Sequence, residues 1–168
     1  MRLPPGVPHH RHPGDGWVTC GDHRHWGLHG AAGLFLVRHD VAASSEATHV
    51  VLQHRATWSH EGGTWGIPGG AVQPTESAET GALREAAEEA GIDPAIVRVV
   101  GEHVLDHGVW TYTTVVGHVT AGVELVPAAT DHESIEVAWV PVSALATLPL
   151  HPAFAQAVPR LLTIASRG

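Results

Sequence analysis

Three glutamates near the middle of the chain constrain its fold and chemistry more than any other feature. Glu85, Glu88 and Glu89 lie in a segment rich in Ala, Leu and Glu, and their spacing puts their carboxylates on one face of a helix. Like charges at this spacing destabilise a helix, and the adjacent Arg84 supplies only one positive charge. Clustered carboxylates suit a hard cation, so the pattern indicates a Mg²⁺ site, with Mn²⁺ as the alternative. A solvated acidic helix face is the competing interpretation.

The helix that carries these glutamates is predicted to span residues 77–90. Ser77 is a favourable N-cap, and Gly91 is a typical residue for the end of a helix. The face opposite the glutamates is small and apolar, so it can pack closely on a sheet. It consists of Ala78, Ala82, Ala86 and Ala90. Gly69 and Gly70 precede the helix, where they let the backbone turn sharply and a ligand come close.

The segment from Gly70 to Ile92 resembles the Nudix box. That pattern is Gly, five residues, Glu, seven residues, Arg-Glu, an apolar residue, any residue, Glu-Glu, any residue, Gly and an apolar residue. Every position is met, by Gly70, Glu76, Arg84, Glu85, Ala86, Glu88, Glu89, Gly91 and Ile92. The resemblance covers residues 30–166. It implies an α/β fold, the Nudix α/β/α sandwich with a mixed β-sheet between helices, and hydrolysis of a nucleoside diphosphate linked to another group.

The resemblance also implies roles for individual carboxylates. Carried over by position, Glu85, Glu88 and Glu89 are metal ligands, and Glu85 is a candidate general base. Many family members use a further glutamate from a loop beyond the box. Glu133 resembles the extra metal-binding glutamate of the MutT subgroup, and Glu136 is the alternative. The catalytic candidates are therefore Glu85 and Glu133, and the implied cofactor is Mg²⁺, with Mn²⁺ as the alternative.

Residues near the box are candidates for binding the substrate. Arg55 ends a predicted strand and resembles a phosphate-contacting arginine of some family members, with a surface arginine as the alternative. Gly69 and Gly70 let a phosphate approach the backbone. Tyr112 lies in an alternating strand and is predicted to be structural. Three tryptophans either stack on a nucleobase or fill the core. They are Trp58, Trp65 and Trp110.

The substrate class is predicted by exclusion. Sequence signatures of NADH pyrophosphatases and of ADP-ribose and coenzyme A hydrolases are absent from this sequence. The resemblance then favours a MutT-like enzyme that converts a nucleoside triphosphate, including oxidised ones, to a nucleoside monophosphate and pyrophosphate. A hydrolase of a nucleotide sugar, dinucleotide or other diphosphate metabolite is the second hypothesis, and a non-catalytic ligand sensor is the third.

Composition limits the domain organisation and the partners. The 168 residues suit one domain, predicted over residues 30–168, after a loose His/Pro/Gly-rich N-terminal extension over residues 1–29. The net charge of −8 argues against a nucleic-acid polymer or an anionic membrane as partner. No signal peptide or membrane-spanning run is evident, so we expect a cytoplasmic protein. Its expected partner is a small-molecule nucleoside diphosphate derivative, and a homodimer is compatible with the sequence.

Strands are predicted over residues 31–38, 49–55, 98–105, 110–121 and 136–141. The first two form a hairpin, and residues 56–70 form a long loop with one short strand. A terminal helix is predicted over residues 152–166, interrupted or kinked at Pro159.

The N-terminal extension also carries metal-ligand residue types. Cys20, His23 and His25 lie near metal-ligand spacing, but a structural zinc site needs a fourth ligand. One of His9, His10 and His12 would have to supply it. A flexible His-rich arm is the alternative interpretation.

Overall fold

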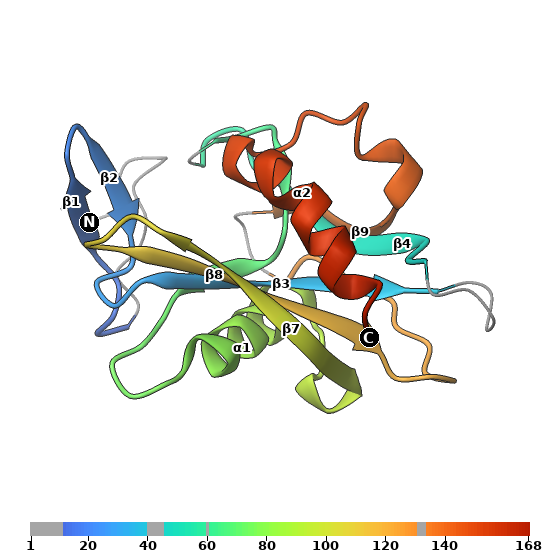
Figure 1. Cartoon of the computed structure of the whole chain (residues 1–168). Helices are drawn as coiled ribbons and strands as arrows, with labels where there is room; N and C mark the ends of the chain where they lie inside the picture. Colours follow the sequence, from blue (N-terminus) through green and yellow to red (C-terminus); the bar gives the residue numbers. More distant parts are fainter. Residues whose placement is uncertain (1–11, 40–45, 60, 131–133) are drawn as a thin grey trace.

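The chain folds around a mixed seven-stranded sheet, with a separate two-stranded sheet near the N-terminus (Figure 1). The computed structural model describes residues 12–39, 46–59, 61–130 and 134–168. Within these residues the elements are β1 (Trp17–Cys20), β2 (His23–Trp26), β3 (Ala31–Arg38), β4 (His49–Arg55), β5 (Trp65–Gly66), β6 (Gly69–Ala71), α1 (Ala78–Ala90), η1 (Pro94–Ile96), β7 (Val97–Asp106), β8 (Thr111–Val119), β9 (Ser134–Pro141), η2 (Val142–Ala144) and α2 (Pro152–Ala165).

Strand β3 organises the large sheet because it has three neighbours. It pairs in parallel with β8 along most of its length. Its first residues pair with β6, where Ala31 lies opposite Ala71, and its last residues pair with β4, where Val37 lies opposite Val50. Strand β4 continues the sheet to β5 and β9. The mixed β-sheet predicted between helices is therefore confirmed, as is the β3–β4 hairpin.

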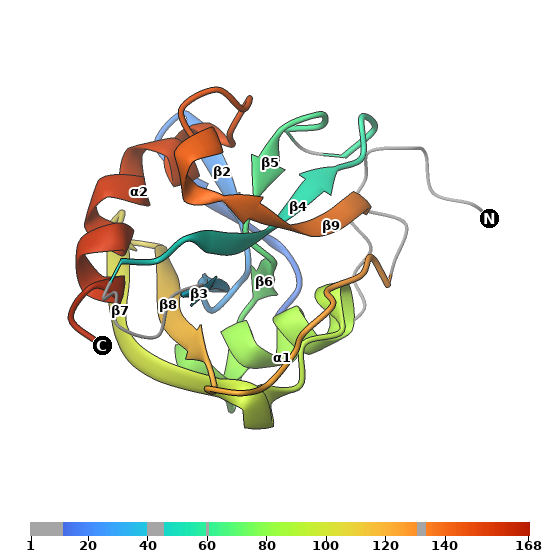
Figure 2. The same ribbon diagram turned by 90° about the vertical axis from the view of Figure 1, so that its right-hand side faces the viewer.

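Both faces of β3 are buried, which explains its continuous apolar sequence. Phe35 and Val37 belong to the core that includes residues of α2, whereas Leu34 and Leu36 belong to the core that includes residues of α1. All four side chains are fully buried. The two helices accordingly cover different faces of the strands (Figure 2). The layered α/β/α arrangement thus follows from one strand that is apolar on both sides.

Helix α1 has the ends and the buried face that the sequence predicted. The Ser77 hydroxyl accepts a hydrogen bond from Thr80 N at 3.1 Å, as an N-cap does. Gly91 adopts the left-handed conformation, with φ of 67°, and ends the helix. Ala82 and Ala86 are fully buried against the sheet. Small side chains on this face hold the helix close to β3 and β6.

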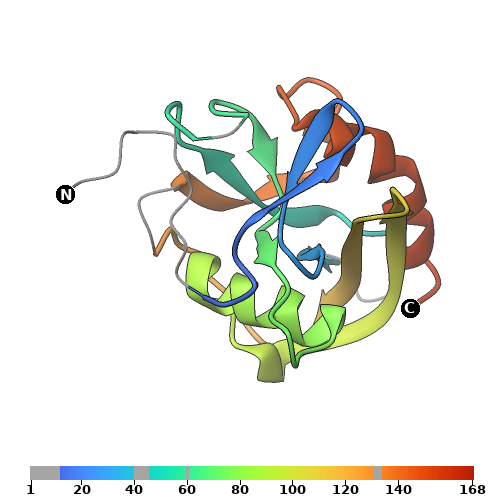
Figure 3. The ribbon, with the colours of Figure 1, turned by 90° about the vertical axis from the view of Figure 1, so that its left-hand side faces the viewer.

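The N-terminal region differs from the loose extension that we expected. Strands β1 and β2 form a hairpin whose turn contains Gly21 in the left-handed conformation, with φ of 60°. Trp17 and Trp26 pack edge to face across it, with ring centroids 5.1 Å apart. Before the hairpin, Gly14 N donates a hydrogen bond to Gln73 Oε1 at 2.8 Å. This segment runs alongside α1 (Figure 3). The high Gly and His content of this segment led us to predict a loose extension, whereas the structure has two short strands there.

Helix α2 runs from Pro152 to Ala165 without a break, so the predicted interruption at Pro159 is wrong. Proline removes one backbone N–H and therefore leaves one carbonyl of the preceding turn, that of Ala155, without its helical partner. Ala155 and Pro159 are both exposed, so water can hydrogen-bond that carbonyl. Within the described residues, no helix is long and apolar enough to cross a membrane.

The close contact between α1 and the sheet gives a first prediction. We expect Ala82→Leu to lower the free energy of unfolding by about 1–3 kcal/mol, because the added atoms have no space between helix and sheet. Urea denaturation measures this change. Ala87→Leu makes the same substitution at a half-exposed position of α1, and we expect its effect to stay within about 0.5 kcal/mol. Equal losses in both variants would contradict the packing argument.

Candidate active site

The candidate site is formed where α1 faces β6. Gly70 lies directly against the Glu85 carboxyl group: a side-chain Cβ at Gly70 would come within 2.6 Å of Glu85 Cδ. A Cβ at Gly69 would come within 2.6 Å of the Ala32 carbonyl oxygen and 2.9 Å of the Tyr112 hydroxyl. Both separations are shorter than van der Waals contact. At Gly69 the obstacle is backbone, so glycine is required there, whereas a side chain at Gly70 would displace the Glu85 carboxyl group.

Arg84 connects the acidic side chains around it. Its guanidinium binds Glu76 through two hydrogen bonds, of 2.7 Å from Nη2 and 3.1 Å from Nε. Nη1 donates to Glu85 at 2.9 Å and to Glu88 at 3.3 Å. Nη2 also donates to the Ala71 carbonyl oxygen at 3.0 Å. One guanidinium thus binds three carboxylates and the end of β6.

These contacts act differently on the pKa values of Glu76 and Glu85, which are both partly buried. The hydrogen bonds from Arg84 lower the pKa of Glu76 below its ordinary value. For Glu85, burial outweighs the hydrogen bond from Arg84, and its pKa is raised. The negative charges of Glu88 and Asp15 raise the Glu85 pKa further. A cation bound at this face would relieve that unfavourable burial of charge.

Burial increases across the predicted metal ligands in a definite order. The Glu88 side chain is 49% exposed, and that of Glu85 is 12% exposed. Glu89 is buried and accepts a hydrogen bond from Gly69 N at 3.1 Å. The structure thus has carboxylates at the surface, at intermediate depth and at the base of one helix face. This all-oxygen donor set fits Mg²⁺ or Mn²⁺ and suits a soft metal poorly.

Arg55 and Tyr112 lie near the buried end of this set. Burial raises the pKa of Tyr112, the negative charge of Glu89 adds to this effect, and the positive charge of Arg55 opposes it. Tyr112 therefore lies close enough to both residues to sense their charges. It was predicted to be structural, and its hydroxyl does pack against Gly69. An alternating strand pattern does not reveal that this hydroxyl faces the carboxylate site.

The predicted extra glutamate, Glu133, lies outside the described residues. The chain before it contacts the C-terminal part of α1: Thr130 N donates to the Glu89 carbonyl at 3.2 Å, and its hydroxyl donates to the Glu88 carbonyl. After it, Ser134 pairs with Arg55. The alternative, Glu136, is exposed on β9. The described residues on either side of Glu133 thus contact α1 and the Arg55 end of β4.

Two of the three tryptophans pack against rings of the protein itself. Trp65 stacks on His54 with ring centroids 4.6 Å apart, and Trp110 stacks on His25 at 4.2 Å. Trp58 is 42% exposed. Within the described residues, Trp58 therefore presents the most accessible indole of the three for stacking on a base.

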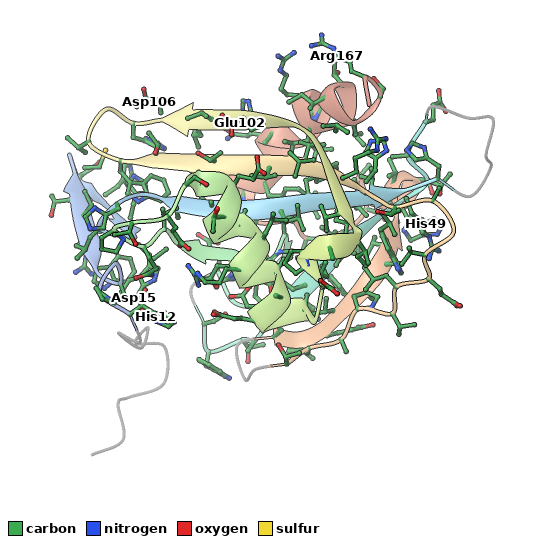
Figure 4. The ribbon with its side chains drawn as sticks, turned by 90° about the horizontal axis from the view of Figure 1, so that it is seen from below. His12, Asp15, His49, Glu102, Asp106 and Arg167 are labelled. Carbon is green, nitrogen blue, oxygen red and sulfur yellow. The ribbon has the colours of Figure 1, made fainter. Side chains whose placement is uncertain are left out.

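The N-terminal segment contributes a residue that sequence analysis did not consider. Asp15 lies beside α1 (Figure 4), and its charge affects Glu85. It also accepts a hydrogen bond from Gln73 Nε2 at 3.5 Å. No sequence signal indicated this contact, because Asp15 lies far from the box in the chain.

Comparisons with known proteins agree with this geometry. The family model described as NUDIX domain matches residues 28–161. The chain is 53% identical over 141 residues to a nucleoside triphosphate pyrophosphatase/Nudix hydrolase fusion protein of Bifidobacterium longum. That alignment covers 83% of this chain but only 29% of the fusion protein, so the chain corresponds to less than a third of that relative.

Two mycobacterial proteins are similar over most of both chains. A Mycobacterium tuberculosis protein provisionally named 8-oxo-dGTP diphosphatase 3 is 46% identical over 161 residues, which cover 91% of this chain and 71% of that protein. The crystal structure of RenU, a Nudix hydrolase of M. smegmatis, superposes with a TM-score of 0.78 at 41% identity. It covers 92% of this chain and 96% of that one.

The Arg84 network predicts a pH-dependent contribution to stability. We expect Glu76→Gln to lower the free energy of unfolding by about 1.5–3 kcal/mol at pH 7, because Arg84 loses a charged hydrogen-bond partner. The pKa of Glu76 is lowered in the folded protein, so its contribution is complete above the unfolded pKa and disappears as pH falls through the folded pKa.

Urea denaturation of wild type and variant between pH 7 and pH 3 measures this difference. The two unfolding free energies should converge at the acidic end. Glu79→Gln, at an exposed position in the first turn of α1, is the control and should not change stability by more than about 0.5 kcal/mol. A Glu76→Gln difference that is independent of pH would show that the Arg84 ion pair is not its source.

Proposed function

Since the chain belongs to the Nudix family of hydrolases, in its MutT-like group, and these enzymes act on phosphoric anhydride bonds, we propose that its substrate is a nucleoside triphosphate. The products would be a nucleoside monophosphate and pyrophosphate. The observation that carries this proposal is the set of carboxylates on α1, packed against Gly69 and Gly70 and oriented by Arg84. The names of the relatives favour a triphosphate, including an oxidised one such as 8-oxo-dGTP.

We assign the metal site to Glu85, Glu88 and Glu89 of α1, with Glu133 as a further ligand. When bound there, Mg²⁺ would neutralise the pyrophosphate charge and acidify a water molecule. Arg84 restrains Glu85 and Glu88 through its Nη1 group, so these side chains lose little conformational freedom when they bind. Gly69 N restrains Glu89 in the same way. Mn²⁺ has the same preference for oxygen ligands and is the alternative cofactor.

Glu85 and Glu133 are the carboxylates that we propose to accept the proton of the attacking water. The Glu85 side chain is only 12% exposed, and the hydrogen bond from Arg84 Nη1 holds its carboxyl group in place. On the substrate side, Arg55 supplies a positive charge beside Tyr112. We also propose that Gly69 and Gly70, which are half-buried beside Tyr112 and Glu85, contact a phosphate group of the substrate. Arg55 and the two glycines therefore lie next to the carboxylates, where a phosphate group of the substrate would bind.

The metal-ligand assignment predicts the effect of a neutral replacement. We expect Glu88→Gln to lower kcat on the order of 10²-fold or more, because the glutamine oxygen keeps the shape but loses the charge that binds the cation. Glu88 is half exposed, so the fold should survive, and thermal unfolding checks this. Glu79→Gln removes an exposed charge from the same helix and should keep full activity. Full activity of Glu88→Gln would refute the assignment.

The substrate is tested by product analysis. Purified protein is incubated with nucleoside triphosphates, 8-oxo-dGTP, nucleotide sugars and dinucleotides, in Mg²⁺ and in EDTA. We expect Mg²⁺-dependent release of a monophosphate and pyrophosphate from a triphosphate, because the carboxylates need the cation to bind a polyphosphate. Cleavage of nucleotide sugars or dinucleotides alone would assign the protein to the second substrate class. Turnover that persists in EDTA would contradict metal dependence.

A further inference from the structure

A second group of metal-ligating side chains lies outside the carboxylate site. Cys20 and His25 of the β1–β2 hairpin and His107 of the β7–β8 turn each offer one ligand atom, and these atoms lie within 4.8 Å of one another. The hairpin and this turn meet at one end of the molecule (Figures 1 and 3). Asp106, labelled in Figure 4, marks the start of the turn. Chain segments far apart in sequence therefore bring a thiol and two imidazoles together.

The structure changes the ligand set that the sequence suggested. Cys20, His23 and His25 were the local trio, with a fourth ligand expected among His9, His10 and His12. Within the described residues, His107 completes the trio instead, and His23 lies 3.1 Å from the Asp22 carboxylate. His9 and His10 lie outside the described residues. His12 lies near Glu76, whose pKa its charge lowers, and so belongs to the other site. The spacing of Cys20, His23 and His25 along the sequence gave no indication that His107 would lie beside Cys20 and His25.

Packing alone does not satisfy the His25 ring. The ring stacks on Trp110 at 4.2 Å with an interplanar angle of 12°, which holds it in one orientation. Its Nε2 atom is buried and has no hydrogen-bond partner within the part of the chain that the structure describes. An unpaired buried nitrogen costs free energy, and coordination of a metal through this atom would satisfy it.

The chemistry of the three side chains also suits a metal ion. Two imidazoles and one thiolate form a borderline-soft donor set, unlike the oxygen set on α1.

We propose that Cys20, His25 and His107 bind one Zn²⁺ ion, with a water molecule in the fourth tetrahedral position. Cys20 and His25 precede the residues that match the family model, whereas His107 lies within them. The ion would thus attach the N-terminal hairpin to the β7–β8 turn of the family fold. It would be separate from the Mg²⁺ ions of catalysis.

Cobalt binding to the full-length protein tests the proposal without measuring activity. The reduced protein is titrated with Co²⁺ in excess Mg²⁺, which occupies the carboxylates, and the thiolate-to-cobalt charge-transfer absorption is followed. We expect the band to saturate at one equivalent of Co²⁺ and to disappear when Zn²⁺ is added. The band requires a thiolate, and Cys20 is the only cysteine, so Cys20→Ser should abolish it.

Histidine variants identify the other ligands. His25→Ala and His107→Ala should each weaken Co²⁺ binding at least about tenfold, since loss of even an outer-shell partner costs 10–100-fold. His107 is exposed, so its replacement should leave the fold intact, as near-ultraviolet circular dichroism can verify. His29→Ala, at an exposed histidine outside the trio, should keep wild-type affinity.

Two results would overturn the proposal. One is the absence of a charge-transfer band in wild-type protein. The other is a band of unchanged affinity in both His25→Ala and His107→Ala, which would mean that Cys20 pairs with other histidines. A Zn²⁺-dependent rise in Tm that is present in wild type and lost in Cys20→Ser would support the proposal that the ion attaches the hairpin to the β7–β8 turn. None of these readouts depends on which substrate the enzyme hydrolyses.

Discussion

The candidate active site depends on the ion-pair network around Arg84. Without it, Glu85 and Glu88 would stand one turn apart on the same helix with nothing to offset their repulsion. The guanidinium binds both of them, together with Glu76 and the Ala71 carbonyl. One cation therefore joins the loop before α1, the helix itself and strand β6. The remaining excess of negative charge on this face is what a divalent metal would neutralise.

Close packing places this network against the sheet. The buried alanines of α1 let the helix approach β3 and β6, and Gly70 leaves room for the Glu85 carboxyl group. Gly69 does the same for the Tyr112 hydroxyl and also donates its N–H to Glu89. The same small residues thus serve both stability and the geometry of the carboxylates.

The two proposed metal sites differ in chemistry and in origin. The carboxylates come from one helix, so their grouping follows from helical periodicity. Cys20, His25 and His107 come from a hairpin and a distant turn, and only the pairing of β7 with β8 brings the third ligand within reach. Oxygen donors suit a hard cation, whereas the nitrogen–sulfur set suits zinc.

The sequence by itself determined what local periodicity encodes. It predicted the bounds of α1 and of β3 and β4, the shared face of the three glutamates, and the mixed sheet between helices, because cap residues, apolar runs and i, i+4 spacing act over a few residues. It did not reveal the β1–β2 hairpin or the proximity of Asp15 to Glu85, and its prediction of an interruption of α2 at Pro159 was wrong. Only the tertiary structure decided these, and it alone brought His107 to Cys20, since contacts between distant segments leave no periodic signal in a single sequence.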